Sequence, residues 1–351
     1  MGKESNYYKD KEQRLKITLQ EQYAELPPFV KAYLEEKPKT SMVVSSKVAY
    51  ASDLLCFFRF LIQSNPLYKE KSPRDFSYQE LEQVTPEDID EYKSYLSLTN
   101  SDAAMARKFA PLKGLYQFCN RRKYVNNNPL TAVILPSAKS RDKHRIIRMD
   151  KEQVNDLRAA VMSSGEGSFS EWQSKLCSRT KQRDYAIIML FLSTGMRVSE
   201  LVGLDLSDID FKRSVVSIVR KGGGSDQVGF VPETTGKALM DYIEGERSSI
   251  LPKVLNEKDR DALFISGKYR RISVDSVQLL VKKYAQIAAP GVGISCHKLR
   301  STYGSTLYNA TGDINLVSKV LGHASPSTTA KYYSDLDNSR KLEAGKIDVY
   351  Q

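Results

Sequence analysis

Apolar residues recur every three or four positions through most of this chain, which is the spacing of a helix face, and one region shows a strand pattern instead. Helical patterns cover residues 45–64, 85–96, 102–121, 184–193, 198–204, 234–246, 273–288, 297–310, 313–321 and 325–333. Residues 215–219 and 228–231 instead show strand-type runs, joined by a glycine-rich stretch typical of a hairpin. The sequence therefore predicts a mainly α fold with a small β-hairpin or sheet.

Capping residues define several of these helices. Ser45 or Ser46 is the expected N-cap of the first helix, and Thr85, followed by a proline, begins the second. Gly195 is placed to end the helix that covers 184–193. Pro111 lies inside the pattern of residues 102–121, so we expect that helix to be kinked or split in two.

The chain length of 351 residues favours two domains. Residues 1–135 are predicted to form a helical domain with a charged helical lead-in and basic edges. Residues 136–149 are polar, basic and without periodicity, as expected of a linker. Residues 150–351 contain the hairpin and the remaining helices, and they form the predicted second domain.

A formal net charge of +11 favours a polyanionic partner, most often a nucleic acid. No apolar stretch is long enough to span a membrane, and the polar N-terminus shows no secretory signal. The candidate contacts to a phosphate backbone are basic residues on helices and in the linker: Arg107, Lys108, Lys113, Lys143, Arg145 and Lys298.

Four cysteines far apart in the sequence, with no CxxC pair, indicate free thiols in a reducing compartment rather than disulfides or zinc ligands. The chain has only three histidines. A dedicated zinc site is therefore not expected.

Polar side chains that could bind an anion or take part in a reaction are found in separate segments of the second half of the chain. Arg197 follows Gly195 at a helix start, where a guanidinium and backbone N–H groups make an anion site. Lys221 stands at the base of the glycine-rich hairpin. His297 and Arg300 are three residues apart on one predicted helix and share a face.

The last two segments are the Leu321–His323 turn and the Tyr332–Tyr333 pair, and each of the five segments also fits an ordinary structural role. Arg197, Lys221 and the polar helix face are common surface features. His323 is equally a capping histidine, and the tyrosines are equally core aromatics. A tyrosine has a pKa of about 10 and needs cationic neighbours before it attacks anything.

Taken together and in this order, the segments resemble the tyrosine recombinase (phage integrase) family. That family combines an arginine in a TGxRxxEL segment, a hairpin lysine, an HxxR helix, an LGH turn and a tyrosine nine residues beyond the last histidine. Thr194–Leu201, Lys221, His297–Arg300 and Leu321–His323 fill the pattern, and the spacing selects Tyr332 over Tyr333. The hairpin after the lysine is longer and richer in glycine than is common in the family.

The resemblance implies a DNA-cleaving and DNA-rejoining enzyme with an N-terminal core-binding domain and a C-terminal catalytic domain. Tyr332 would attack a DNA phosphate to give a 3′-phosphotyrosyl link, without a metal or cofactor. Arg197 and Arg300 would hold the phosphate oxygens, and Lys221 would protonate the leaving 5′-oxygen. His297 would accept the tyrosine proton or bind the phosphate, and His323 would donate a hydrogen bond to it.

The family also implies a homotetramer on two specific double-stranded DNA sites, coupled by C-terminal tails such as residues 334–351. The lead-in and the hairpin look similar to the single-recombinase Xer type, which implies chromosome dimer resolution during cell division in the bacterial cytoplasm, at the nucleoid. The residues leave open an integrase or excisionase of a mobile element. A type IB topoisomerase-like enzyme and a non-catalytic DNA-binding protein are further alternatives.

Overall fold

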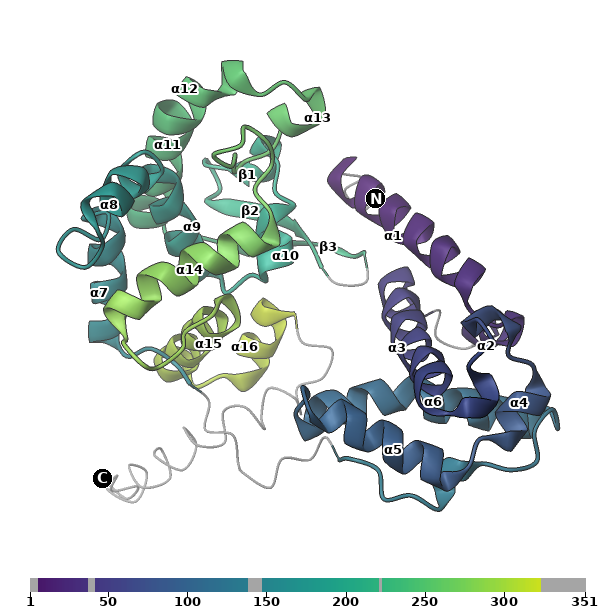
Figure 1. Ribbon diagram of the computed structural model, residues 1–351. Coiled ribbons are helices and arrows are strands. Elements are labelled where there is room, and N and C mark those ends of the chain that lie inside the picture. The colour runs from purple at the N-terminus through teal and green to yellow at the C-terminus, as the bar shows by residue number, and fades with distance from the viewer. Residues whose placement is uncertain (1–5, 37–41, 138–146, 221–222, 323–351) are drawn as a thin grey trace, which may run out of the picture. The chain divides into compact units, whose positions relative to one another are not determined.

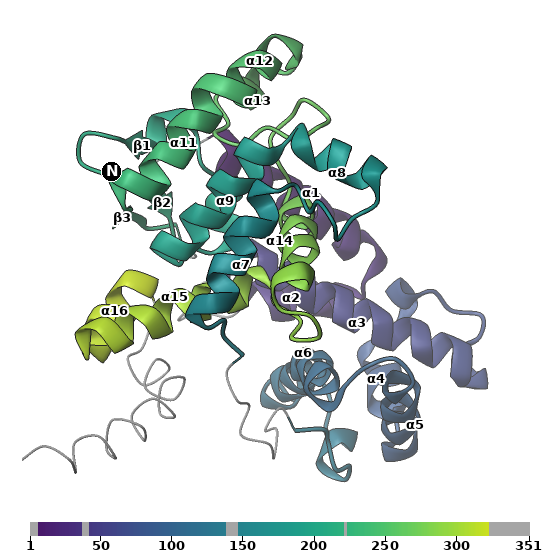
Figure 2. The ribbon, with the colours of Figure 1, turned by 90° about the vertical axis from the view of Figure 1, so that its left-hand side faces the viewer.

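The computed structural model describes residues 6–36, 42–137, 147–220 and 223–322. The chain divides into two compact units, one of residues 8–144 and one of residues 145–351 together with residues 1–7. The division falls inside the segment predicted as a linker. We call the two parts the N-terminal unit and the C-terminal unit and describe each by itself (Figures 1 and 2).

The N-terminal unit is built from helices. They are α1 (Asn6–Glu25), whose first two residues are grouped with the other unit, α2 (Pro28–Glu35), α3 (Val44–Ser64), α4 (Tyr78–Gln83), α5 (Pro86–Ser97) and α6 (Asp102–Arg121). α6 packs on α2, α3 and α5. Aromatic side chains fill the centre of the unit, where the rings of Phe57 and Tyr92 meet edge to face with centroids 5.1 Å apart.

One local prediction for this unit was wrong, and of the two outcomes expected at Pro111, a kink or a split, the split is not observed. α3 begins after Val43, which gives no side-chain cap, so neither Ser45 nor Ser46 is the N-cap. Pro111 does not split α6, which continues from Asp102 to Arg121. Proline removes one backbone N–H, but Pro111 is buried beside Leu112 in a helix face that packs on its neighbours, and this packing offsets the lost hydrogen bond. Thr85, by contrast, caps α5 as predicted.

In its described residues the C-terminal unit combines helices with a small three-stranded sheet, so the predicted mainly α fold with a hairpin is confirmed. Its helices are α7 (Lys151–Met162), α8 (Glu171–Ser178), α9 (Lys181–Thr194), α10 (Val198–Val202), α11 (Lys237–Tyr242), α12 (Ser248–Ile250), α13 (Glu257–Arg260), α14 (Val274–Ala288), α15 (Cys296–Thr311) and α16 (Ile314–Leu321). α9 is central and packs on α7, α11 and α15 (Figure 2). Buried residues, among them Ile187, Leu190 and Phe191, occur on several faces of α9 because other elements cover the helix on several sides.

The sheet has the strand order β1 (Ile209–Asp210), β2 (Val215–Val219), β3 (Ser225–Gly229), and all pairs are antiparallel. Val219 pairs with Ser225, so β3 begins three residues earlier than predicted and ends at Gly229 rather than Val231. Hydrogen bonds from β2, rather than the apolar pattern, set this start. β1 was not expected from the sequence, because two residues carry no recognisable periodicity.

The end of the predicted linker is fixed on the C-terminal unit. Met149 is buried in the core of that unit, and its backbone N–H donates to the Thr302 hydroxyl of α15 at 2.9 Å. Arg148 reaches the Ser305 hydroxyl on the same helix at 3.4 Å. Residues 138–146 of the segment, which include the candidate contacts Lys143 and Arg145, lie outside the described residues.

Candidate active site

The turn between α9 and α10 presents Arg197. α9 ends at Gly195, whose φ of +60° is the left-handed conformation that glycine adopts without strain. A Cβ atom there would lie 2.4 Å from the Tyr303 ring of α15, so glycine also permits the close approach of the two helices. The Thr194 hydroxyl accepts a hydrogen bond from the Met196 N–H at 3.3 Å, which orders the turn that leads into Arg197.

Arg197 is held by a buried carboxylate of its own helix. Glu200, only 2% exposed, accepts the Arg197 backbone N–H at 2.8 Å and the Arg197 Nη1 at 2.9 Å. Arg197 Nη2 donates to the carbonyl oxygen of Gly322 at 3.1 Å. The Arg197 side chain remains 29% exposed, so it is oriented by protein contacts and still accessible from solvent.

Arg300 comes from the face of α15 that points toward the same turn. It is 3% exposed, and its Nη1 donates to the Gly195 carbonyl at 2.7 Å. Its Nη2 donates to the carbonyl of Leu321. Arg300 therefore ties the end of α9 to the end of α16.

His297 lies one turn earlier on α15 and is exposed. Partial loss of hydration lowers the pKa of its imidazole below the usual 6.5, and the positive charges of Arg300 and Arg197 lower it further. The imidazole is therefore neutral at pH 7 in the free protein. A neutral imidazole can accept a proton or donate one N–H hydrogen bond.

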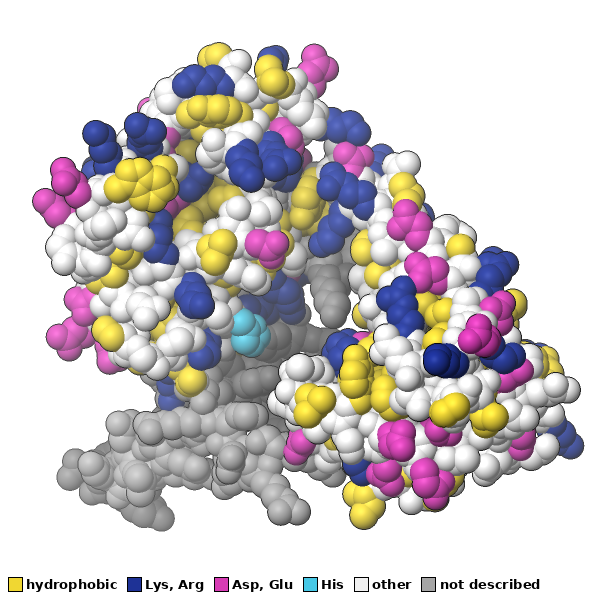
Figure 3. Space-filling view, viewed as in Figure 1, with side chains coloured by type: hydrophobic (Ala, Val, Ile, Leu, Met, Phe, Trp, Pro, Cys, Tyr) yellow, Lys and Arg dark blue, Asp and Glu magenta, His cyan; other side chains and the backbone are white. Residues whose placement is uncertain are grey.

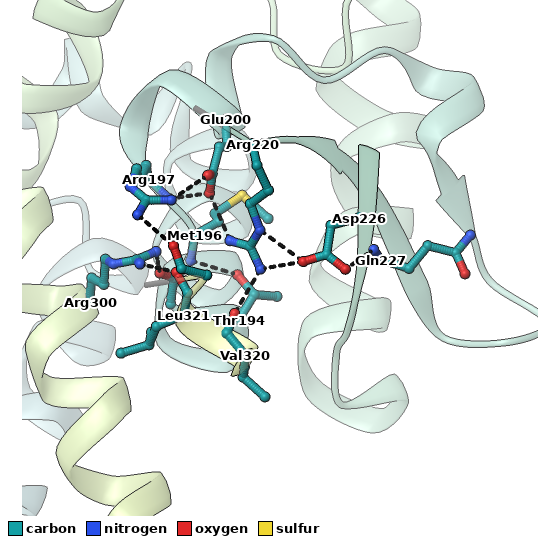
Figure 4. A network of polar contacts seen from close by, with 12 residues as sticks. Thr194, Met196, Arg197, Glu200, Arg220, Asp226, Gln227, Arg300, Val320 and Leu321 are labelled. Atoms are coloured by element: carbon teal, nitrogen blue, oxygen red, sulfur yellow. Dashed lines mark hydrogen bonds and ion pairs between the residues drawn. The ribbon is translucent and has the colours of Figure 1, made fainter. Parts of the chain in front are cut away.

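The carboxyl end of α16 gathers three guanidinium groups (Figure 4). Arg220 donates to the carbonyl of Val320 at 2.7 Å, Arg300 to that of Leu321, and Arg197 to that of Gly322. The last carbonyls of a helix have no partner within the helix and carry the negative end of its dipole, so cations stabilise them. The result is a cluster of three guanidinium groups, partly balanced by the Glu200 and Asp226 carboxylates, at the point where the chain enters His323.

The structure thus brings together Arg197, His297 and Arg300, which the sequence singled out, at the end of the turn that precedes His323. Lys221, His323 and Tyr332 lie outside the described residues, as do the predicted helix 325–333 and the tail 334–351. Sequence reasoning missed Glu200 and Arg220. Glu200 stands inside the Thr194–Leu201 segment, where an acid three residues after an arginine at a helix start is a recognisable capping signal. Nothing in the sequence marked Arg220, the residue before Lys221.

The candidate DNA contacts outside this site differ in their surroundings. Arg107 and Lys108 both pair with the buried Asp53, at 2.9 and 3.2 Å. Lys113 is exposed on α6. Lys298 donates to the Gly293 carbonyl at 2.7 Å, so it also orders the loop before α15.

One surface of the N-terminal unit is acidic and is therefore unsuited to binding DNA. Acidic side chains gather over α5 in the space-filling view (Figure 3), where Glu87, Asp90 and Glu91 are exposed. A phosphate backbone is repelled from such a face. Within the N-terminal unit, the exposed Lys113 of α6 is therefore a better candidate contact than any residue of α5.

Two further properties bear on function. Among the described residues, no three His, Cys, Asp or Glu side chains are grouped so that they could hold a metal ion. No helix in the described part of the chain is long and apolar enough to cross a membrane. All four cysteines are free thiols, and burial raises the pKa of Cys119 to about 12 and that of Cys296 to about 11.

Comparison with known proteins identifies the class. Residues 148–340 match the model of the phage integrase family, and this range contains every catalytic residue proposed from the sequence. The chain belongs to this family, the tyrosine recombinases, which are enzymes that cleave and rejoin DNA.

Curated relatives within the family are Xer recombinases. Tyrosine recombinase XerC of Caldanaerobacter subterraneus subsp. tengcongensis is 35% identical over 307 residues, covering 84% of this chain and 79% of the relative. Tyrosine recombinase XerS of Streptococcus thermophilus is 29% identical over 351 residues, covering 92% and 96%. The predicted membership of the tyrosine recombinases, most like the Xer type, is therefore confirmed.

A solved structure shows the same fold. The XerH site-specific recombinase, bound to a palindromic difH substrate in a post-cleavage complex, matches with a TM-score of 0.62 at 19% identity. The match covers 86% of this chain and 81% of XerH.

Proposed function

We propose that this Xer-type recombinase cleaves a specific DNA site through Tyr332 and that the groups described above form its phosphate-binding centre. One observation carries the proposal. Arg197 and Arg300, from separate helices, both donate to carbonyls at the end of α16, beside the histidine turn that the family pattern requires. Distant motifs that share a catalytic role have to meet in this way.

The residue types fit phosphoryl transfer. As the Tyr332 oxygen bonds to phosphorus, negative charge builds up on the non-bridging oxygens, and planar guanidinium forks match their geometry. The bond from phosphorus to the 5′-oxygen breaks, and Lys221 supplies the proton that this oxygen takes up. His297, neutral at pH 7, accepts the tyrosine proton or binds the phosphate. His323 donates a hydrogen bond to a non-bridging oxygen.

The positive charge supplied by Arg197, Arg300 and Lys221 makes metal-independent chemistry sufficient. The phosphotyrosyl link conserves the energy of the broken phosphodiester, so the reverse attack by a 5′-hydroxyl rejoins the strand without another energy source. Removing one preorganised donor of this kind typically lowers a rate by about 10²–10³-fold. The same range is expected when Arg197 or Arg300 is replaced.

The proposed partner is double-stranded DNA with a specific recombination site, bound by a homotetramer that joins two such sites. The XerH structure, solved on its difH substrate, supports the DNA partner. The tail of residues 334–351 is the proposed docking segment between subunits. Deleting residues 340–351 should abolish tetramer assembly on DNA, measured by sedimentation velocity, and unchanged assembly would exclude this role.

Chromosome dimer resolution in the bacterial cytoplasm, at the nucleoid, is the biological role we propose for this reaction. The likeness to XerS over 92% of the chain supports it. A Xer recombinase acting on chromosome dimers also fits the net charge of +11, since a basic protein associates with DNA at many sites before it finds its own.

The test is covalent capture. The substrate is a duplex with the dimer-resolution site of the source chromosome and a nick close to the cleavage point. After cleavage, the short fragment that carries the 5′-hydroxyl dissociates, so the strand cannot be rejoined. The phosphotyrosyl adduct therefore accumulates and is seen on a denaturing gel. Wild-type protein should form the adduct, and Tyr332→Phe should not. Tyr333→Phe is the matched control and should retain it.

Each alternative result has a definite meaning. An adduct that survives in Tyr332→Phe and disappears in Tyr333→Phe would move the nucleophile by one residue. Tight binding without any adduct, on sites from the chromosome and from mobile elements alike, would contradict strand cleavage and leave a DNA-binding protein.

A further inference from the structure

The side chain of Arg220 connects three elements that are distant in the sequence. Arg220 follows the last residue of β2 and is 12% exposed. Its Nε donates to Asp226 of β3 at 2.8 Å, its Nη2 to the Val320 carbonyl of α16 at 2.7 Å, and its Nη1 lies 3.4 Å from Glu200 of α10 (Figure 4). One guanidinium thus joins the hairpin, α10 and α16.

The geometry of these contacts requires arginine. Three partners approach three different nitrogens of one planar group, and lysine, with a single ammonium, cannot reach them in these directions. Gly322 packs directly against this side chain: a Cβ atom at Gly322 would lie 2.9 Å from Arg220 Nε. The φ of Gly322 is +59°, a left-handed conformation that glycine adopts without strain. Glycine at this position therefore permits both the turn at the end of α16 and the close approach of the Arg220 guanidinium.

The hairpin itself is also anchored at this residue. The backbone N–H of Arg220 donates to the Gly224 carbonyl at 2.7 Å, and the Arg220 carbonyl accepts the Gly223 N–H at 3.0 Å. Backbone and side chain together therefore fix where the hairpin starts relative to α16. The two residues that follow these anchors in the chain are Lys221, after Arg220, and His323, after Gly322.

We propose that Arg220 is a positioning residue that fixes the base of the β2–β3 hairpin against the end of α16, and so sets where Lys221 stands in the reaction. The proposal rests on the function proposed above. Arg220 also shares Glu200 with Arg197, since both guanidiniums contact the same buried carboxylate.

A leaving-group substitution separates positioning of the general acid from a general loss of activity. In a DNA whose scissile 5′-bridging oxygen is replaced by sulfur, the leaving group departs as a thiolate, because thiols ionise with a pKa of about 8.5. Such a substrate does not need a proton from Lys221. A variant that misplaces only the general acid is therefore slow on ordinary DNA and fast on the sulfur-containing DNA.

The experiment measures single-turnover cleavage of both DNAs by full-length Arg220→Lys, with Lys221→Ala for comparison. Arg220→Lys should cleave ordinary DNA about 10- to 100-fold more slowly than wild type, the loss expected when a reacting group is displaced by about 1 Å. Its rate on the sulfur-containing DNA should recover to within a few-fold of wild type. Arg213→Lys is the matched control in the β1–β2 turn of the same sheet. Arg213 is exposed and contacts Gln227 of β3, and its replacement should leave both rates unchanged.

Two outcomes would overturn the proposal: a rate on ordinary DNA within about twofold of wild type, or an equal loss on both DNAs. If Arg220→Lys does not fold, Asp226→Asn takes its place, since Asp226 is 42% exposed and contacts Arg220 directly. An unchanged rate on ordinary DNA in Asp226→Asn would then exclude the role. Failure of the proposed function is recognised separately, because wild type itself would then form no Tyr332-dependent adduct.

Discussion

Replacing Glu200 by glutamine should destabilise the C-terminal unit by about 2–3 kcal/mol. The carboxylate is 2% exposed and accepts two short bonds from Arg197, at 2.8 and 2.9 Å, besides its contact with Arg220 at 3.4 Å. Glutamine has one carbonyl oxygen, so it can keep the bond to the backbone N–H of Arg197. Its NH₂ group then faces the Arg197 guanidinium, and two donors meet.

The magnitude follows from these contacts. A hydrogen bond to a charged group contributes about 1.5–3 kcal/mol, and breaking a fully buried ion pair costs about 3–5 kcal/mol. Arg197 keeps 29% of its side chain exposed and can be rehydrated when its partner is lost. The cost should therefore lie below the range for a fully buried pair and in the upper part of the range for a charged hydrogen bond, at about 2–3 kcal/mol.

The chain has two units, so the assay has to report the opening free energy of the C-terminal unit alone. Hydrogen exchange measured by mass spectrometry at increasing urea concentration gives the opening free energy from peptides of α9 and α15, both of which belong to the C-terminal unit. Asp226→Asn is the control. It also removes a carboxylate from this network, but Asp226 is 42% exposed, so its loss should cost less than about 1 kcal/mol.

A loss in Glu200→Gln no larger than that in Asp226→Asn would refute this reasoning. It would mean that the two guanidiniums are held by the carbonyls of α16 and by Asp226, and that the buried carboxylate adds nothing to their placement.

Three other results are expected. Arg247→Met should lower the opening free energy of the C-terminal unit by about 2–4 kcal/mol, because the buried guanidinium satisfies backbone carbonyls that methionine would leave without a donor; a loss below about 1 kcal/mol would argue against this. In an NMR titration the His297 imidazole should show a midpoint below 6.5 that rises in Arg197→Ala, and a midpoint above 6.5 would contradict the repulsion described. Because the His297 pKa is lower in the folded chain, the unfolded chain binds the imidazole proton more tightly. The contribution of His297 to the free energy of unfolding is therefore present above pH 6.5 and is lost as the pH falls through the folded pKa. Lys113→Ala should reduce the slope of log Kd against log salt by about 1 if the exposed lysine contacts a phosphate, whereas Lys108→Ala should change the slope less because Lys108 already pairs with an aspartate.

Much of this architecture could be predicted from the sequence because the signals are local. The helices at 102–121, 273–288 and 297–310 have apolar faces repeated every three or four residues, and each was found within about two residues of its ends. Gly195 and Thr85 were recognised as a helix end and a helix start from their residue types alone. Such patterns depend on neighbours a few positions away, which a single sequence contains.

The candidate site was anticipated in part for a different reason. Arg197, His297 and Arg300 match an ordered family pattern, so a resemblance could single them out before any contact was known. Their convergence on the carbonyls of α16 was not readable from the pattern. It depends on how α9, α15 and α16 pack, with residues more than 100 positions apart in the chain in contact.

By itself, then, the sequence determined the helices, the hairpin and the residue types of a phosphate-binding centre, because periodicity, caps and motif spacing are properties of short stretches. Only the tertiary structure decided that Arg220 joins β3 to α16, that Pro111 leaves α6 whole and that Met149 packs under α15. Each of these depends on a partner far away in the chain. The energy of such a contact exists only once packing has brought the two parts together and excluded water between them.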